Sequence, residues 1–144
     1  MIALAKTLLV VLVGDQILKL LLRRFMGPAS LPLGPFGNVR MVSGQIWVRR
    51  FGGFSGAVMW ALWAAAAVVL VIVSTSVPSS QVFVGLLLGG SLSNALESTL
   101  RGTVTDYICL KLWPAFNLAD LALTVGIIGT AVTLLLAAWC GVAK

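Results

Sequence analysis

Histidine is absent from this chain of 144 residues, and only four of its residues are acidic. Without histidine the chain cannot build a zinc peptidase site of the HExxH type, a Ser–His dyad or a Cys–His nucleophile pair. Its two cysteines, Cys109 and Cys140, are too few for a disulfide framework or a metal cluster. We interpret both cysteines as small apolar residues.

Charge is scarce along the whole chain. Charged residues make up 10% of the sequence and hydrophobic residues 60%, whereas a soluble domain averages about 25% charged and about 45–50% apolar residues. The composition therefore indicates a membrane protein. The formal net charge of +6 comes from basic residues beside apolar runs, which favours contact with anionic membrane lipids and predicts no nucleic-acid partner.

Four apolar segments are each about long enough to cross a bilayer: residues 3–22, 57–73, 81–101 and 116–139. The expected fold is a single domain over residues 1–144, an all-α membrane protein with four transmembrane helices, and we expect a monomer. Small residues in the third segment predict close helix packing in lipid: Gly85, Gly89 and Gly90.

Two stretches between these segments are predicted to lie outside the bilayer. Residues 26–54 begin rich in glycine and proline and then partly alternate, which predicts an interfacial loop with a small β element. Its expected interfacial anchors are Trp47, Arg49, Arg50, Phe51 and Phe54. Residues 102–114 form the second predicted loop, which contains Asp106.

Polar residues inside apolar segments are costly, so they mark function. Asp15 and Lys19 are four residues apart on the first helix and can form an ion pair, while Arg23 and Arg24 are expected to snorkel into the headgroups. At helical spacing, two further polar stripes follow: Asn94, Glu97, Ser98 and Arg101 in the third segment, and Asn117, Asp120 and Thr124 in the fourth. Glu97 and Arg101 are also spaced for an ion pair.

Antiparallel helices would let these stripes face each other, with Asp106 added from the connecting loop. Two adjacent carboxylates cannot both ionise cheaply, so one keeps a proton while the other polarises a water molecule, as in aspartic proteases. Three alternatives stay open at this point. They are a structural ion-pair network with Arg101, Lys111 and Lys19, a small transporter with a relay through Asp15, Lys19 and Asp120, and a Ser–Lys peptidase that uses Lys19.

Three motifs occur in order along the chain: GDQILK at residues 14–19, GGSLSNALESTLRGTVTDY at 89–107 and FNLAD at 116–120. Together they resemble the lipoprotein signal peptidases (signal peptidase II). Members of that family are four-span aspartyl peptidases of bacterial inner membranes that remove the signal peptide before a lipid-modified cysteine of prolipoproteins. The resemblance covers most of the chain and implies a prolipoprotein substrate, with no metal and no organic cofactor.

By this resemblance Asp106 and Asp120 are the catalytic aspartates. Asn94 and Asn117, together with Arg101 and Glu97, are expected to contact substrate. Asp15, Gln16 and Lys19 are expected to have a structural role and to hold the site residues in place without contacting substrate.

The sequence departs from the family pattern where Glu97 and Ser98 replace the usual Asp-Arg pair. The segment SGQIW at residues 43–47 also lacks the asparagine of the family's first loop. These departures suggest an alternative, a catalytically altered or inactive paralogue that binds lipidated or signal-peptide substrates.

Orientation in the membrane is predicted in two opposite ways. Most basic residues flank the two loops, which by the positive-inside rule would place the loops in the cytoplasm. The resemblance implies the opposite: a multi-pass protein of the inner membrane with cytoplasmic termini and an active site toward the extracytoplasmic face. We adopt the second orientation.

Overall fold

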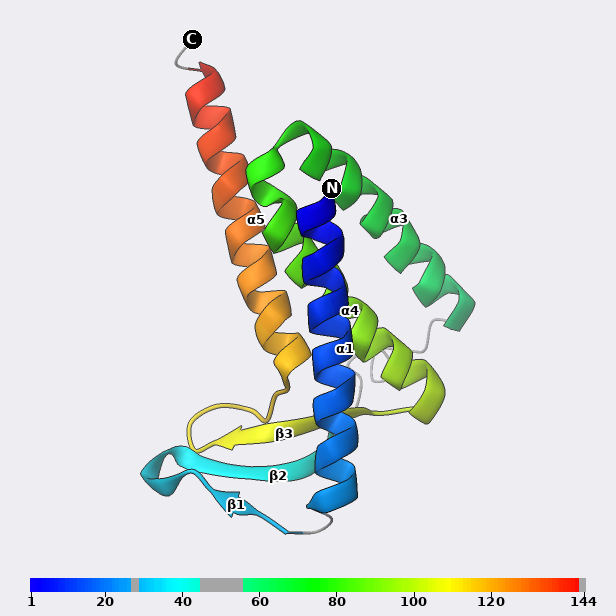
Figure 1. Ribbon diagram of the computed structural model, residues 1–144, viewed down its shortest axis with the longest axis vertical. Coiled ribbons are helices and arrows are strands. Elements are labelled where there is room, and N and C mark those ends of the chain that lie inside the picture. The colour runs from blue at the N-terminus through cyan, green and yellow to red at the C-terminus, as the bar shows by residue number, and fades with distance from the viewer. Residues whose placement is uncertain (27–28, 45–55, 143–144) are drawn as a thin grey trace.

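A computed structural model describes residues 1–26, 29–44 and 56–142 of the chain. In this part of the chain, four long helices of 21–25 residues make up most of the structure. They are α1 (Ile2–Phe25), α3 (Gly56–Ser76), α4 (Gln81–Arg101) and α5 (Leu118–Val142). The smaller elements are the strands β1 (Leu31–Pro32), β2 (Gly37–Gly44) and β3 (Val104–Leu110) and the 3-10 turns η1 (Gly34–Phe36) and η2 (Pro78–Ser80). In Figure 1 the sheet lies across one end of the helices, and the start of α1 and the end of α5 lie at the other.

Two helices are long and apolar enough to cross a membrane, Gly56–Ser76 and Leu118–Gly141, with mean hydropathies of 2.4 and 2.3. Their apolar side chains face mainly outward, since only 0% and 17% of the most apolar 18-residue stretch of each helix is buried inside the protein. This is the inverse of a soluble bundle, where such faces are covered. Helices α1 and α4 carry most of the charged side chains of the four helices, which lowers their hydropathy.

Helix α4 lies at the centre and contacts α1, α5 and α3. Its glycines make this possible, because a Cβ atom at Gly89 would lie 2.7 Å from the carbonyl oxygen of Leu8 in α1, and one at Gly90 would lie 2.5 Å from that of Ala119 in α5. The predicted close packing is therefore confirmed. Helix α3 is tied to α4 by indole hydrogen bonds from Trp60 and Trp63.

The sheet is antiparallel in the order β1-β2-β3. β2 and β3 pair from Gly37 opposite Leu110 to Gly44 opposite Val104, with an irregularity between Val39 and Val42. The small β element predicted after residue 26 is confirmed for residues 37–44. The five predicted interfacial anchors of this loop lie outside the described residues.

The second predicted loop needs a correction, because residues 104–110 form strand β3. This stretch, VTDYICL, is rich in β-branched and aromatic residues, which favour strands. The chain enters it through Gly102, whose φ of 73° ends α4 in the left-handed conformation that glycine adopts easily. Along β3, Thr105 and Tyr107 are buried, while Asp106 between them points to the opposite face and is half-buried.

Candidate active site

The site is built around the first turn of α5. The Asn117 side-chain oxygen accepts a hydrogen bond from the Asp120 backbone N–H at 2.9 Å, and the Asp120 carboxylate accepts one from the Asn117 N–H at 3.1 Å. This reciprocal pair is a capping box, which satisfies two N–H groups that a helix start leaves unpaired. The helix start therefore fixes where the Asp120 carboxylate lies.

Two further N–H groups of this first turn bond to side chains from other elements. The Leu118 N–H donates to the Tyr107 hydroxyl at 2.8 Å, and the Ala119 N–H donates to the Asp15 carboxylate at 3.2 Å. Backbone groups near hydrocarbon need such partners because no water is there to replace them. β3 and α1 thereby hold the start of α5 in place.

Asn117 also links the two predicted catalytic carboxyl groups. Its side-chain nitrogen donates to Asp106 Oδ1 at 2.9 Å, while its backbone N–H bonds Asp120 as described. Asn117 is itself fully buried, with 0% of its surface exposed. Asp106 from β3 and Asp120 from α5 are both half-buried, so one rigid, buried residue bonds two carboxyl groups that remain partly accessible.

A second amide holds Asp120 from the other side. Asn94 in α4 donates to Asp120 Oδ1 at 2.8 Å, and its own side-chain oxygen accepts a hydrogen bond from Lys19 at 2.9 Å. Because the lysine ammonium can only donate, it fixes the Asn94 amide with its nitrogen toward Asp120. Lys19 therefore acts on the site through Asn94.

Lys19 also belongs to a network of buried charged side chains. Lys19 is fully buried and pairs with Asp15 at 2.7 Å and with Glu97 at 2.9 Å. Glu97 also pairs with Arg23 and accepts a hydrogen bond from Thr105 at 2.5 Å. Two cations and two anions balance one another, as buried charges require.

This network confirms one predicted ion pair and corrects two other expectations. Asp15 and Lys19 pair as predicted. Glu97 does not pair with Arg101 within the described residues, because Lys19 and Arg23 of α1 surround its carboxylate instead. Arg23 is only 19% exposed and binds Glu97 rather than snorkelling outward.

Hydrogen bonds of Gln16 and Ser93 join α1 to α4. Gln16 donates to the Ser93 hydroxyl oxygen at 2.8 Å and to its carbonyl oxygen at 3.1 Å, and the Ser93 hydroxyl donates to Asp15 at 2.6 Å. These contacts fasten α1 to α4 directly behind the ion network. Tyr107, Thr105 and Ser93 were not predicted as part of the site. The alternation of residue types along β3, which is typical of a strand with one buried face, was the available signal for Tyr107 and Thr105.

Burial and the neighbouring carboxylate shift the titration of the site. Burial, followed by the charge of Asp120, raises the pKa of Asp106 to about 6, although the hydrogen bond from Asn117 opposes the shift. Burial also raises the pKa of the Tyr107 hydroxyl above its usual range. Tyr107 is therefore a neutral phenol at physiological pH.

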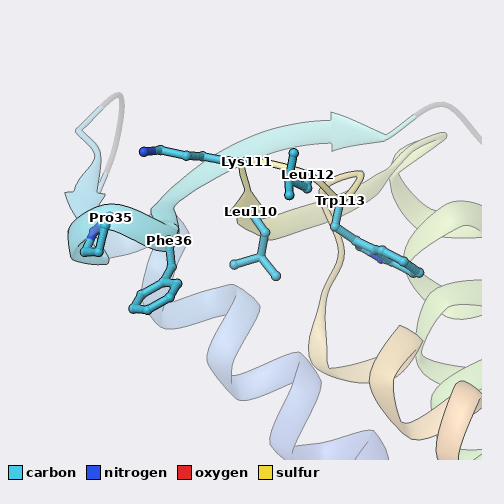
Figure 2. A pocket seen from close by; sticks show the side chains of 6 residues that line it. All are labelled: Pro35, Phe36, Leu110, Lys111, Leu112 and Trp113. Atoms are coloured by element: carbon cyan, nitrogen blue, oxygen red, sulfur yellow. The ribbon is translucent and has the colours of Figure 1, made fainter.

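Two neighbouring apolar cavities lie beside the sheet, and the smaller one reaches the site. One of about 250 Å³ is lined by Asp120 and by five other residues, Leu110, Trp113, Phe116, Leu121 and Thr124. The other, of about 720 Å³, lies beneath the far end of the sheet and is lined by the six residues of Figure 2, which include Phe36, Leu110 and Trp113. Leu110 and Trp113 line both cavities, so the two apolar cavities are neighbours. In Figure 2 Phe36 and Leu110 extend from the same side of the sheet, while Lys111 extends away from them.

Comparison with known proteins identifies the family. The family described as Signal peptidase (SPase) II matches residues 7–136. The chain belongs to the signal peptidase II family. A lipoprotein signal peptidase of Burkholderia mallei (strain SAVP1) is 32% identical over 132 residues, which cover 82% of this chain and 78% of the relative. One from Moorella thermoacetica is 41% identical over 51 residues, 35% of this chain and 34% of that relative.

Solved structures share the fold. A bacterial membrane enzyme determined by the in meso method at 2.3 Å resolution superposes with a TM-score of 0.77 at 24% identity, covering 92% of this chain and 87% of that one. A second such structure, at 1.9 Å resolution, gives a TM-score of 0.76 at 25% identity and covers 92% of each chain. This chain is thus a protease of the signal peptidase II family with the fold of a bacterial membrane enzyme.

The structure also places Glu97 and Ser98, the first departure from the family motif, whereas residues 45–47 of the second departure lie outside the described residues. Glu97 is 2% exposed inside the ion network, and Ser98 is half-buried on the same helix. Arg101 ends α4 with an exposed side chain, away from the hydrogen bonds that join Asn94, Asn117 and the two aspartates. Substrate contact by Glu97 or Arg101 stays a prediction, as do the roles assigned to the other site residues.

Proposed function

We propose that this protein is an intramembrane aspartyl endopeptidase that cleaves the signal peptide of prolipoproteins before a diacylglyceryl-modified cysteine. One observation carries the proposal: Asn117 bonds Asp106 and Asp120 at once, and the two carboxyl groups come from different elements. Family membership supports the same reaction class.

The chemistry follows from the different surroundings of the two carboxyl groups. Asp106 has a pKa raised to about 6, so its proton is held more strongly than in a free aspartate. Asp120 accepts hydrogen bonds from the Asn94 side chain and from the Asn117 backbone N–H. The pair titrates as a unit that shares one proton. The ionised member takes a proton from water as the water attacks the scissile carbonyl, and the protonated member supplies one to the peptide.

A lipid-modified substrate fits the surface beside the pair. The apolar cavity under the sheet (Figure 2) shares the lining residues Leu110 and Trp113 with the smaller cavity that Asp120 lines. Acyl chains need apolar surroundings, whereas the peptide needs the polar groups at the start of α5. The two requirements meet at Asp120.

We propose that all four long helices cross a bacterial inner membrane, with the sheet and the aspartates at the extracytoplasmic face. The outward apolar surfaces of α3 and α5 support two of these spans. For α1 and α4, internal pairing of their charges supports the other two, since paired charges are tolerated in membranes. Residues 1–144 act as one domain, and we propose a monomer.

The test is a cleavage assay on a diacylglyceryl-modified precursor with purified protein. Asp106→Asn and Asp120→Asn should each lower kcat by about 10²–10⁴-fold, the range for losing an acid or base group. Both replacements keep an oxygen that can accept the hydrogen bonds of Asn117, so the thermal unfolding temperature checks that the fold survives. Undiminished cleavage by either variant would refute the assignment.

The same assay separates the peptidase from a binding-only relative. A precursor without the lipid modification should be cleaved poorly, because the apolar cavity then lacks an occupant. Wild-type protein that binds the lipidated precursor without turnover would instead favour the inactive paralogue. Among the described residues Glu97 pairs with Lys19 and Arg23 and accepts a hydrogen bond from Thr105, and these contacts within the protein do not favour that alternative.

A further inference from the structure

A polar hollow lies on the other side of β3 from Asp106, at the sheet end of the helices. It measures about 450 Å³ and is lined by Arg23, Arg101, Thr103, Thr105 and Ser43, with Met41 and Val42 of β2. It shares no lining residue with the two cavities beside Asp120. The catalytic proposal therefore makes no use of it.

Arg23 enters this hollow with its position fixed and much of its binding capacity unused. Its Nη2 donates to Thr105 at 2.8 Å and pairs with Glu97. A guanidinium carries five N–H donors, and within the described residues no partner engages Nε or Nη1. A planar donor group held rigidly beside a polar cavity is suited to an oxygen-rich anion.

Arg101 supplies the charge. Its side chain is exposed and forms no ion pair within the described residues. The hydroxyls of Ser43 and Thr103 likewise have no hydrogen-bond partner in the part of the chain that the structure describes. Because Arg23, Lys19, Glu97 and Asp15 balance one another, Arg101 is the one uncompensated charge among the described residues that line the hollow.

We propose that this hollow binds a singly charged phosphate group, held between Arg101 and Arg23 with hydroxyl donors from Thr103 and Ser43. Arginine is favoured for phosphate because its planar fork matches phosphate oxygens in pairs. The excess of one positive charge matches a phosphodiester better than a doubly charged phosphate monoester. The volume of about 450 Å³ admits a phosphate with its substituents.

The position of the hollow selects phospholipid headgroups as a source of this phosphate. Arg101 is the last residue of α4, and Arg23 lies in the last turn of α1, at the end of the helices that meets the sheet (Figure 1). In the proposed membrane arrangement that end lies at the lipid–water boundary. This step rests on the proposed function only for its membrane orientation and does not depend on the aspartates.

Binding can be measured on protein that is catalytically silent. The Asp106→Asn variant is purified in a detergent without phosphate, and bound phosphatidylglycerol is quantified by native mass spectrometry across a lipid titration. Arg101→Gln should weaken binding about tenfold or more, the effect of losing charge-assisted hydrogen bonds. Arg101→Lys should give a smaller loss, because it keeps the charge but not the fork. Arg40→Gln removes the same charge from an exposed position on β2 outside the hollow, and should change nothing.

The choice of probe identifies the source. Phosphatidylcholine has the same phosphodiester but no net charge and should bind more weakly than phosphatidylglycerol. Competition by inorganic phosphate would show that any phosphate anion is accepted, whereas failure to compete would show that the hollow needs the lipid itself; both results support the site. The proposal would be overturned if the Asp106→Asn protein bound phosphatidylglycerol equally well with no further change, with Arg101→Gln and with Arg40→Gln. Since cleavage is not measured, a failure of the peptidase assignment leaves this result unaffected.

Discussion

Asn117 illustrates how one residue can serve structure and site together. Its backbone N–H, its side-chain oxygen and its side-chain nitrogen all have partners, and it is completely buried. A buried amide with unpaired groups would cost free energy, so full pairing keeps it in one orientation. The start of α5 and the placement of both aspartates thus depend on the same side chain.

The raised pKa of Asp106 predicts how stability depends on pH. Its pKa is 3.8 in an unfolded chain and about 6 in the folded protein. The folded state therefore binds the proton more tightly, which favours folding below pH 4; this contribution is lost as pH rises through 6. Asp106→Asn should make the protein more stable than wild type at pH 8, by about 1–2 kcal/mol after solvent screening of a half-buried group. The difference should shrink as the pH falls toward 4.

Thermal unfolding in detergent across pH 4–8 measures this difference. Thr124→Val is a suitable comparison, because Thr124 lines the same cavity as Asp120 but carries no titratable group. Its stability relative to wild type should not vary with pH. A wild-type protein that is more stable than Asp106→Asn at pH 8 would contradict the assigned direction of the pKa shift.

Local spacing predicted part of this site and could not predict the rest. Asp15 and Lys19 lie within one helix, so their separation of four residues was enough to predict the pair. Arg23 and Glu97 are 74 residues apart, and their pairing depends on how α1 packs on α4. The N-x-x-D spacing of Asn117 and Asp120 also fits a capping box, a signal readable from sequence.

At the scale of elements, the missed strand β3 shows the same limit. Its sequence favours a strand, but a strand needs a partner, and β2 lies some sixty residues earlier in the chain, at Gly37–Gly44. Four long apolar segments, by contrast, are local features, and the helices α1, α3, α4 and α5 were predicted within a few residues of their ends. β3 was therefore missed, whereas β2, which has the same distant pairing, was predicted from the alternation of its own residues.

Close contact between α4 and α5 predicts the effect of one methyl group. In Gly90→Ala the new Cβ would lie 2.5 Å from the carbonyl oxygen of Ala119, next to Asp120, and backbone atoms cannot move aside easily. We expect a loss of about 1–3 kcal/mol in unfolding free energy, and a fall in kcat because α5 shifts relative to Asp106.

Gly141→Ala is the matched control, since the same methyl group there meets nothing within 4 Å. This variant should be neutral or slightly stabilising, because alanine favours a helix over glycine by up to about 1 kcal/mol. Thermal unfolding and cleavage assays on both variants provide the comparison. If Gly90→Ala were as stable and active as Gly141→Ala, the contact would not position Asp120.

At the scale of the whole molecule, charge is concentrated inside and at one end, while the sides are apolar. Large apolar side chains are exposed along the helices, among them Leu9 at 56%, Ile72 at 60% and Leu135 at 70%. Lys19 and Asp15 are both at 0%. This distribution suits a lipid surround, where outward apolar side chains cost nothing and charges need internal partners.

The pairing of charges also bears on membrane orientation. Basic residues gather at the sheet end, which by the positive-inside rule argues for a cytoplasmic site. However, Arg23 is neutralised by Glu97 within the folded protein, and the proposed phosphate site gives Arg101 an anionic partner outside the chain. The basic residues at this end therefore have uses other than setting topology, which reduces the weight of the rule here.

We predict that both ends of the chain lie in the cytoplasm. A fluorescent protein fused after the last residue should fluoresce, and alkaline phosphatase fused there should be inactive, because the start of α1 and the end of α5 lie opposite the sheet (Figure 1). Alkaline phosphatase fused after Leu112, in a chain truncated at that point, should be active, since this position follows β3 on the sheet side. The reverse pattern would place the aspartates in the cytoplasm, where a peptidase acting on exported precursors could not meet its substrate.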